Sequence, residues 1–262
     1  MIGKLGRWWQ GRREEAALRR RPIADDLWKR TLIRYPFLRA ESAPGAPALR
    51  RMTSLFLDRK EFSAVPPVRL TNDVVVAVAA QACLPVLHLG LARYDGFVGI
   101  VLHPDQVVAP RQHLDEFGVM HEYEQTLAGE VVEGGPVMLS WRDVRGSGRT
   151  AHEGYNVVIH EFAHVLDMAD GLSDGIPPLP PDWPRAEWAA VLEQEYGSFV
   201  DRVNADEVTA LDPYGAEGPD EFFAVASEAF FVSPLRLLGE HPALYALLAR
   251  FYRTDPAAGP GR

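Results

Sequence analysis

Residues 156–168 read NVVIHEFAHVLDM, and this stretch decides the interpretation of the chain. Its apolar residues recur at helical spacing around a few polar ones. Asn156 is a plausible N-cap, and Gly171 follows where a helix would end. The stretch therefore predicts a helix over residues 156–169, with an apolar surround that belongs in a protein core.

This helix carries an H-E-x-x-H motif at His160, Glu161 and His164. Residues four apart in an α-helix project from nearly the same side, so the two imidazoles can share one tetrahedral ion. Zinc, with bonds of about 2.0–2.1 Å to histidine nitrogen, suits the pair. Glu161 projects about 100° away from the first histidine and can reach a water on the metal. The motif predicts that Glu161 is the general base of a zinc peptidase. The alternative is a pair of core histidines bonded to backbone carbonyls, with Glu161 exposed.

A catalytic zinc site normally has three protein ligands, so a third must come from elsewhere. Asp170 lies six residues after the second histidine, but motifs that use this position need a glycine where Asp167 stands. The rival is Glu221, in a predicted helix that begins near Pro219. Glu228 lies seven residues further on, about 10.5 Å along the helix axis, so both glutamates cannot bind one ion. We expect Glu221 to be the ligand, and Glu228 to support a ligand or the helix packing.

Two other residues are candidates for supporting roles. Tyr214, in the loop before the second helix, could hydrogen-bond the oxyanion that develops during the reaction. A loop tyrosine taken alone is more often a packing residue. Asp167 could orient a histidine through its other ring nitrogen, or it could simply begin the exit from the helix.

The composition limits the class of protein. The chain has 262 residues, of which 47% are hydrophobic and 24% charged, enough for a substantial core and against disorder. A single cysteine, Cys83, excludes an internal disulfide framework and a cysteine-only metal site. The net charge is −9, although residues 1–39 carry eleven Lys or Arg against four Asp or Glu. Such an acidic body argues against nucleic acid as the main partner.

No secretion signal or membrane span is expected. The basic start reaches Trp8 and Trp9 and then turns polar, so the apolar region of a signal peptide is missing. The best membrane candidate, residues 74–92, contains Gln81 and Pro85 and fits a buried core helix better. We therefore expect a cytoplasmic protein.

The remaining patterns predict an α+β protein with a small sheet between an N-terminal and a C-terminal helical part. We expect a weakly ordered basic lead over residues 1–21 and a Gly/Ser/Arg-rich loop over 145–153. The predicted strands are 97–103, 130–132 and 137–141, and the predicted helices are 24–38, 49–62, 73–82, 156–169, 184–204, 219–232 and 241–253.

Zinc peptidases of the HExxH type commonly hold the substrate as an added strand on a sheet edge. Residues 137–141 form the nearest predicted strand before the HExxH helix. They are a candidate for that edge, and a buried inner strand is an equally good interpretation.

At these residues the chain resembles a known family, the Mlc titration factor A zinc peptidases of bacteria. The resemblance spans roughly residues 50–256. Its most specific parts are IHEFAHVLDM at 159–168 and EFFAVASE at 221–228, supported by CLPVL at 83–87 and by Asp212 with Tyr214.

The resemblance implies a zincin-type catalytic core related to that of anthrax lethal factor. It implies one zinc ion per chain held by His160, His164 and Glu221, with Glu161 as the base and Tyr214 near the metal. It also implies aminopeptidase activity and, for some members, binding of the transcriptional repressor Mlc. On this basis we expect a basic lead and helix over 1–47, a zincin-like peptidase domain over 48–256 and a tail over 257–262.

The leading hypothesis is a cytoplasmic, aminopeptidase-like zinc peptidase that uses a zinc-activated water and a glutamate base. Its partner is a peptide, with no role for nucleic acid or membrane. The alternative is a regulatory protein that sequesters a transcriptional repressor, with zinc mainly structural. A closed structural zinc site is the weakest interpretation, since such sites normally have four protein ligands and no cysteine lies near His160.

Overall fold

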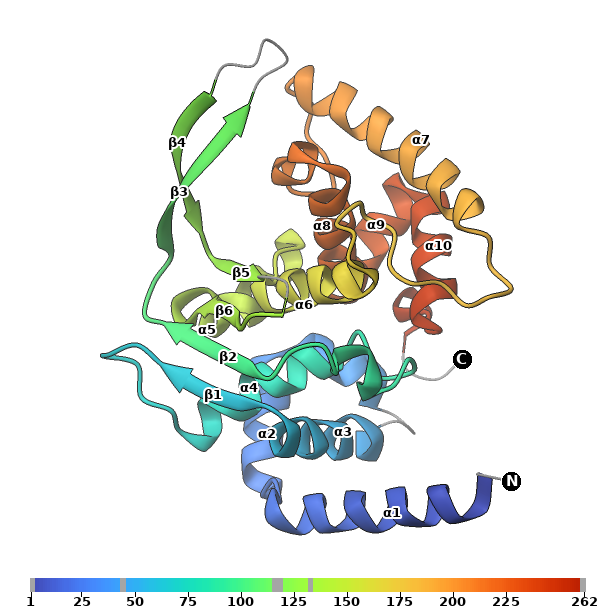
Figure 1. The fold of residues 1–262 in the computed structure, drawn as a ribbon. Helices are drawn as coiled ribbons and strands as arrows, with labels where there is room; N and C mark the ends of the chain where they lie inside the picture. The colour runs from blue at the N-terminus through green and yellow to red at the C-terminus, as the bar shows by residue number, and fades with distance from the viewer. Residues whose placement is uncertain (1–2, 43–45, 115–119, 132–133, 260–262) are drawn as a thin grey trace.

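The computed structural model describes residues 3–42, 46–114, 120–131 and 134–259. The first helical part contains α1 (Gly3–Arg20), α2 (Asp25–Arg34), α3 (Ala46–Arg59) and α4 (Asn72–Cys83), and the 3-10 helix η1 (Pro36–Ser42) follows α2. The last part contains α7 (Arg185–Asn204), α8 (Pro219–Val232), α9 (Pro234–Glu240) and α10 (Pro242–Tyr252). Helix α6 (Val157–Asp167) and the main sheet lie between these two groups (Figure 1). The predicted α+β class is confirmed.

The main sheet has four strands in the order β1 (Glu61–Ala64), β2 (Gly99–His103), β6 (Val137–Ser140) and β5 (Gly129–Val131). The first three run parallel, and β5 runs antiparallel to β6. Because β6 pairs on both sides, it is an inner strand. The suggestion that residues 137–141 form the free edge is wrong, and β5 is the edge strand that packs beside α6.

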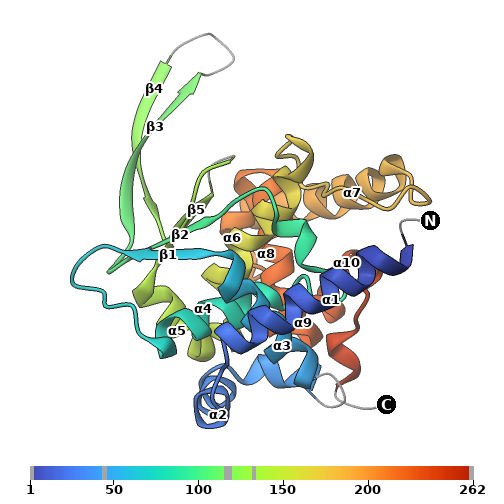
Figure 2. The same ribbon diagram turned by 60° about the horizontal axis from the view of Figure 1, so that its bottom comes forward.

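A second, two-stranded sheet stands apart from the first. Strands β3 (Val107–Leu114) and β4 (Met120–Leu127) pair antiparallel with each other. Both views show this pair rising away from the rest of the molecule (Figures 1 and 2). No strand was predicted over residues 107–127. The sequence there has no turn signal as clear as those that bound the predicted strands of the main sheet.

Several boundaries differ from the sequence-based expectation. Residues 3–20 of the predicted lead form α1, which packs on α3 and is joined to it by ion pairs such as Arg20 to Asp58 at 2.6 Å. Helix α3 ends at Arg59, so the end of the predicted helix 49–62 belongs to β1. Most of the predicted loop over 145–153 belongs to α5 (Trp141–Thr150), which Ser140 caps through its side chain. Helix α10 starts at Pro242 and matches the predicted helix 241–253, whereas the short helix α9 before it was not predicted.

Aromatic packing joins α6 to the first helical part. Phe162 is fully buried, and its ring lies 5.0 Å from Tyr94, 5.7 Å from Phe97 and 5.8 Å from Phe56, between ring centroids. Edge-on and tilted ring contacts of this kind add to the burial of apolar area. The cluster therefore fixes the position of the helix that carries the HExxH motif.

Phe162→Ala should destabilise the protein strongly, because it removes the ring at the centre of this cluster and leaves a cavity. We expect a loss of about 3–5 kcal/mol in the free energy of unfolding. Urea unfolding followed by circular dichroism measures the change. Ile33→Ala, at an exposed apolar position, is the control and should cost far less. Equal losses in the two variants would contradict the central role of the cluster.

Within the described parts of the chain, the structure contains no helix with the length and apolar character needed to cross a bilayer. Helix α4 covers the start of residues 74–92, the best membrane candidate in the sequence, and nine of its residues are buried in the protein core.

Candidate metal centre

Two helices that are distant in the sequence bring the predicted ligands together. Helix α6 packs against α8, and the 3-10 helix η5 (Pro213–Glu217) leads into α8. His160 and His164 project from α6 toward Glu221, which lies in the first turn of α8. Asn156 starts α6 by accepting a hydrogen bond from the backbone of Ile159, and this cap sets where the motif begins along the helix.

Three ligand atoms form a nearly regular triangle. The Nε2 of His160 lies 3.1 Å from Oε2 of Glu221, the Nε2 of His164 lies 3.4 Å from the same oxygen, and the two nitrogens are 3.2 Å apart. Atoms bonded to one tetrahedral zinc at about 2.0–2.1 Å lie roughly 3.3–3.4 Å from each other. Oε2 of Glu221 is also buried without an aligned hydrogen-bond donor. The geometry and this oxygen both fit a zinc-sized cation at the centre of the triangle.

The charges around the triangle favour a cation there. Burial alone would raise the pKa of Glu221, but the two close imidazoles hold that pKa well below its ordinary value. Burial opposes a charge on His160, yet Glu228 and Glu221 raise the pKa of this imidazole well above its usual range. Burial also raises the pKa of the Glu161 carboxyl to about 7, against the opposing effect of the histidines. Carboxylates of Glu221 and Glu228 therefore lie close to the imidazoles, and a proton or a metal ion there can offset their negative charge.

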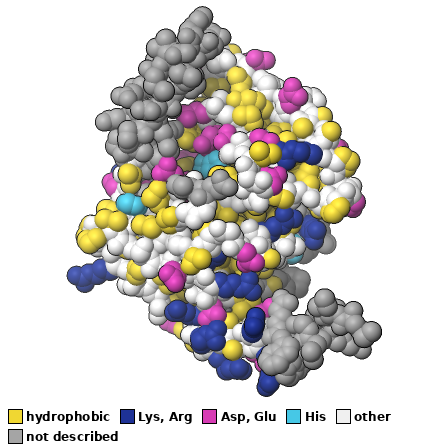
Figure 3. All heavy atoms as spheres, in the orientation of Figure 1, with side chains coloured by type: hydrophobic (Ala, Val, Ile, Leu, Met, Phe, Trp, Pro, Cys, Tyr) yellow, Lys and Arg dark blue, Asp and Glu magenta, His cyan; other side chains and the backbone are white. Residues whose placement is uncertain are grey.

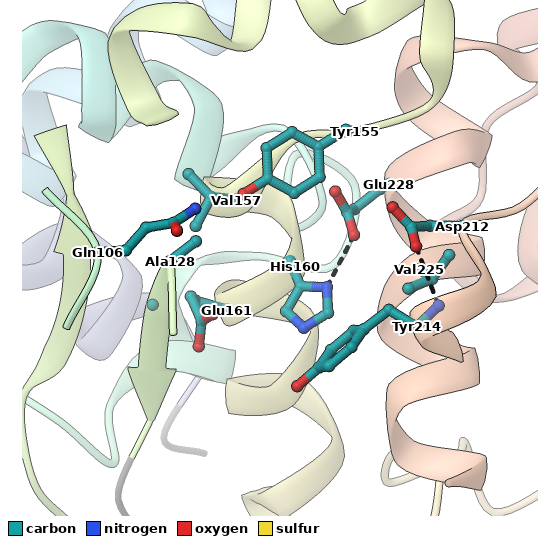
Figure 4. Close-up of a pocket in the computed structure, with 11 residues that line it drawn as sticks. Gln106, Ala128, Tyr155, Val157, His160, Glu161, Asp212, Tyr214, Val225 and Glu228 are labelled. Carbon is teal, nitrogen blue, oxygen red and sulfur yellow. Dashed lines mark hydrogen bonds and ion pairs between the residues drawn. The ribbon is translucent and has the colours of Figure 1, made fainter. Parts of the chain in front are cut away.

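Glu228 fixes the orientation of one ligand. Its side chain is almost fully buried, and its Oε1 lies 2.7 Å from Nδ1 of His160 (Figure 4). With the proton on Nδ1, the lone pair of Nε2 faces the ligand triangle. Carboxylates in this position orient metal-binding histidines and make them more basic. From the sequence, Glu228 could either support a metal ligand or serve helix packing. Its contact with His160, a predicted ligand, favours the first role.

Glu228→Gln should weaken metal binding by about 10–100-fold, because the amide keeps the shape but loses the charge that orients and polarises His160. Competition against a chromogenic zinc chelator measures the affinity. Glu195→Gln is the matched control. Oε2 of Glu195 lies at the same distance, 2.7 Å, from Nδ1 of His241, and this pair is not part of the ligand triangle. Unchanged zinc affinity in Glu228→Gln would show that Glu228 serves packing alone.

Glu161 projects away from the triangle and toward the edge strand. It is 5% exposed and lines a cavity of about 190 Å³ (Figure 4). Gly129 of β5 lies directly against its carboxyl group, and a side chain at this position would collide with it. The other residues that line the cavity are Gln106, Ala128, Tyr155, Val157, His160, Asp212, Tyr214, Val225 and Glu228. In the space-filling view, histidine lies in a hollow of the surface with acidic side chains around it (Figure 3).

Tyr214 lies beside the triangle. Its hydroxyl is 3.3 Å from Oε1 of Glu221, and its ring is 5.9 Å from that of His160, between centroids. Asp212 caps η5 by accepting a hydrogen bond of 2.9 Å from the backbone N–H of Tyr214. The phenol is therefore held at the mouth of the candidate centre.

Two residues considered from the sequence lie elsewhere. Asp170 pairs with Arg185 at 3.4 Å and is not part of the triangle. Asp167 accepts a hydrogen bond of 2.9 Å from the backbone N–H of Gly175, so it anchors the loop after α6 rather than a histidine. Gly129 and Tyr155 also line the cavity of the candidate site, and neither was predicted from the sequence. Only the tertiary packing of β5 beside α6 reveals the role of the glycine.

The chain is similar to known metallopeptidases and to proteins named for a related function. The family model described as glucose-regulated metallopeptidase M90 matches residues 7–253. Mlc titration factor A of Edwardsiella ictaluri is 37% identical over 236 residues, covering 85% of this chain and 88% of that protein. Its counterpart in Yersinia pestis is 33% identical over 233 residues, covering 86% and 84%. An uncharacterized protein of Synechocystis is 34% identical over 245 residues, covering 92% and 88%.

Proposed function

This chain belongs to the M90 family of glucose-regulated metallopeptidases, and from that premise we propose that it hydrolyses peptides with one zinc ion held by His160, His164 and Glu221. The observation that carries the proposal is the triangle of three ligand atoms with edges of 3.1–3.4 Å. Its two imidazoles and one carboxylate are the donor set of many catalytic zinc sites, which leave a further position open.

The residues around the triangle have distinct tasks in this reaction. When bound, zinc supplies Lewis acidity, which lowers the pKa of water and polarises the scissile carbonyl. Glu161 accepts the proton of the attacking water and later delivers it to the leaving amine. The hydroxyl of Tyr214 donates a hydrogen bond to the carbonyl oxygen as negative charge develops there.

The edge strand offers a place for the substrate main chain. One side of β5 is paired with β6, and the described residues provide no partner strand on the other side. A peptide that adds to this edge beside Gly129 passes the carboxyl group of Glu161, which is in contact with that glycine. The cavity next to Glu161 is then available for a substrate side chain.

We further propose that the enzyme prefers a free amino terminus, as the family resemblance implies. The acidic residues that line the cavity are Glu161, Asp212 and Glu228, and no Lys or Arg lines it among the described residues. A substrate ammonium group is therefore favoured over a carboxylate. Comparison of a peptide with its N-acetylated form tests this preference: equal rates would contradict it without touching the assignment of the metal.

Zinc content and peptide hydrolysis, measured together, test the main proposal. Freshly purified protein should contain about one zinc per chain, which matches the one ligand triangle found among the described residues. Removal of zinc with a chelator should abolish hydrolysis of a mixed peptide library, and added zinc should restore it. Full hydrolysis by metal-free protein, or the absence of stoichiometric metal in an active sample, would refute the proposal.

Tyr214→Phe should lower kcat by about 100-fold and affect KM and zinc content much less, because the hydrogen bond to the developing oxyanion is lost in the transition state and the 3.3 Å contact with Glu221 in the free protein is long. Steady-state kinetics with one chromogenic substrate give both constants. Tyr196→Phe is the control, since the hydroxyl of Tyr196 bonds to the backbone of Ala216 in the same η5 segment, at 3.0 Å. A larger loss in the control would assign the effect to the position of η5 rather than to the Tyr214 hydroxyl.

A second function is suggested by the names of the relatives. Two of the proteins compared above are called Mlc titration factor A. We propose that this chain also binds a transcriptional repressor of the Mlc type, with the basic helix α1 as a candidate contact. Capture of purified Mlc by the full-length protein, before and after zinc removal, tests this function independently of catalysis.

A further inference from the structure

One buried polar side chain in α4 needs an explanation. The other buried residues of this helix are apolar, yet Gln81 is 0% exposed. A buried amide is costly unless its polar atoms are hydrogen-bonded. The Nε2 of Gln81 donates to the backbone oxygen of Ala77 at 3.0 Å, one turn earlier. Its Oε1 accepts from Nδ2 of Asn156 at 2.9 Å, so Gln81 connects the first helical part to the start of α6.

Asn156 can take only one orientation. Its Oδ1 caps α6 by accepting from the backbone N–H of Ile159 at 3.0 Å, so its Nδ2 must face Gln81. The backbone N–H of the same residue donates to Oε2 of Glu228 on α8. Asn156 therefore joins three elements, α4, α6 and α8, and two of these carry the candidate ligands.

The chain of bonds ends at a candidate ligand. Both oxygens of Glu228 are engaged, Oε2 by Asn156 and Oε1 by Nδ1 of His160. The second bond turns the Nε2 of His160 toward Glu221, which lies on the same helix as Glu228. A shift of Asn156 would therefore change both the orientation of His160 and the spacing between α6 and α8.

We propose that Gln81 is a positioning residue of the metal centre, which acts through Asn156 and Glu228 on His160. The inference rests on the proposed function in so far as it concerns metal affinity. Gln81 lies outside the ligand triangle and outside the substrate cavity. Its effect is to hold the unbound triangle in a geometry that already suits the ion, so less reorganisation accompanies binding.

Zinc affinity in four variants tests this proposal. Gln81→Leu and Asn156→Ser should each weaken zinc binding by about 10-fold, in the range found for outer partners of metal ligands. The serine retains a hydroxyl that can cap α6 and a backbone N–H for Glu228. The double variant should lose about 10-fold and not 100-fold, because both changes break the same bond. Val78→Ala, also fully buried in α4, should lower Tm but leave zinc affinity unchanged.

The measurements are chelator competition for zinc and the thermal unfolding of each metal-free protein. Wild-type affinity in Gln81→Leu, additive losses in the double variant, or an equal loss in Val78→Ala would overturn the proposal. If Gln81→Leu does not fold, Asn156→Ser decides: unchanged affinity there also overturns it. A wild-type protein that binds no zinc would instead refute the proposed function, so the two failures are distinguishable.

Discussion

Glu161→Gln should bind zinc normally and lose peptidase activity almost completely. General acid–base catalysis contributes about 10²–10⁴-fold to a rate, and glutamine can neither accept nor deliver the proton. The side chain lies outside the ligand triangle and against Gly129, so an amide of the same size fits the same place. We expect kcat to fall by at least about 100-fold with little change in KM.

The stability of the same variant gives an independent check. Burial raises the pKa of Glu161 to about 7, which means that the folded protein disfavours the charged form. Removal of the charge should therefore leave the Tm of the metal-free protein unchanged or slightly higher at pH values above 7. Elemental analysis, steady-state kinetics and thermal unfolding complete the experiment. Retained hydrolysis in a sample with confirmed zinc would eliminate Glu161 as the base.

Glu221→Ala should remove the metal itself. The triangle would keep its two imidazoles and lose its carboxylate, so zinc affinity should fall by more than the 10–100-fold typical of outer-partner changes. Peptidase activity should be lost at zinc concentrations that saturate the wild type.

Thermal unfolding with and without zinc shows this loss directly. An ion that binds only the folded state stabilises it by about 4 kcal/mol at 1,000 times its Kd. The wild type should therefore gain Tm on addition of zinc, and Glu221→Ala should gain little. Glu228→Gln should recover the gain at higher zinc concentrations, since its ligand triangle is intact. An equal zinc-dependent shift in Glu221→Ala and the wild type would exclude Glu221 as a ligand.

The sequence predicted the local geometry of the candidate site, namely the helix that carries the HExxH motif. His160, Glu161 and His164 lie within one helix, so their relative directions follow from helix geometry alone. Asn156 caps that helix as predicted, and Gly171 follows it in a left-handed conformation with φ of 86°. Spacing alone could not choose between Asp170 and Glu221. The packing of α6 on α8 brings Glu221 close and leaves Asp170 beside Arg185.

Features that depend on tertiary pairing were harder to predict. Residues 130–132 and 137–141 were predicted as strands, but their order in the sheet could not be, because it follows from the non-local pairing of β6 with β2 and from the pairing of β5 with β6. Helix α1 has no clear apolar stripe, so its packing on α3 could not be inferred from periodicity. The role of Gly129 is a further case, because it depends on the approach of an edge strand to the side chain of Glu161.

The two ligand-bearing helices lie far apart along the chain, and this separation has a consequence for the whole enzyme. An ion bound by both His164 and Glu221 would cross-link the two ends of a long chain segment, which includes α7 and η5. Such a cross-link limits how far this segment can move away from the rest of the protein while the ion is bound. Zinc binding at this one site would then affect both peptidase activity and the stability of the fold. Loss of zinc would inactivate the enzyme and loosen the packing of the segment between His164 and Glu221 at the same time.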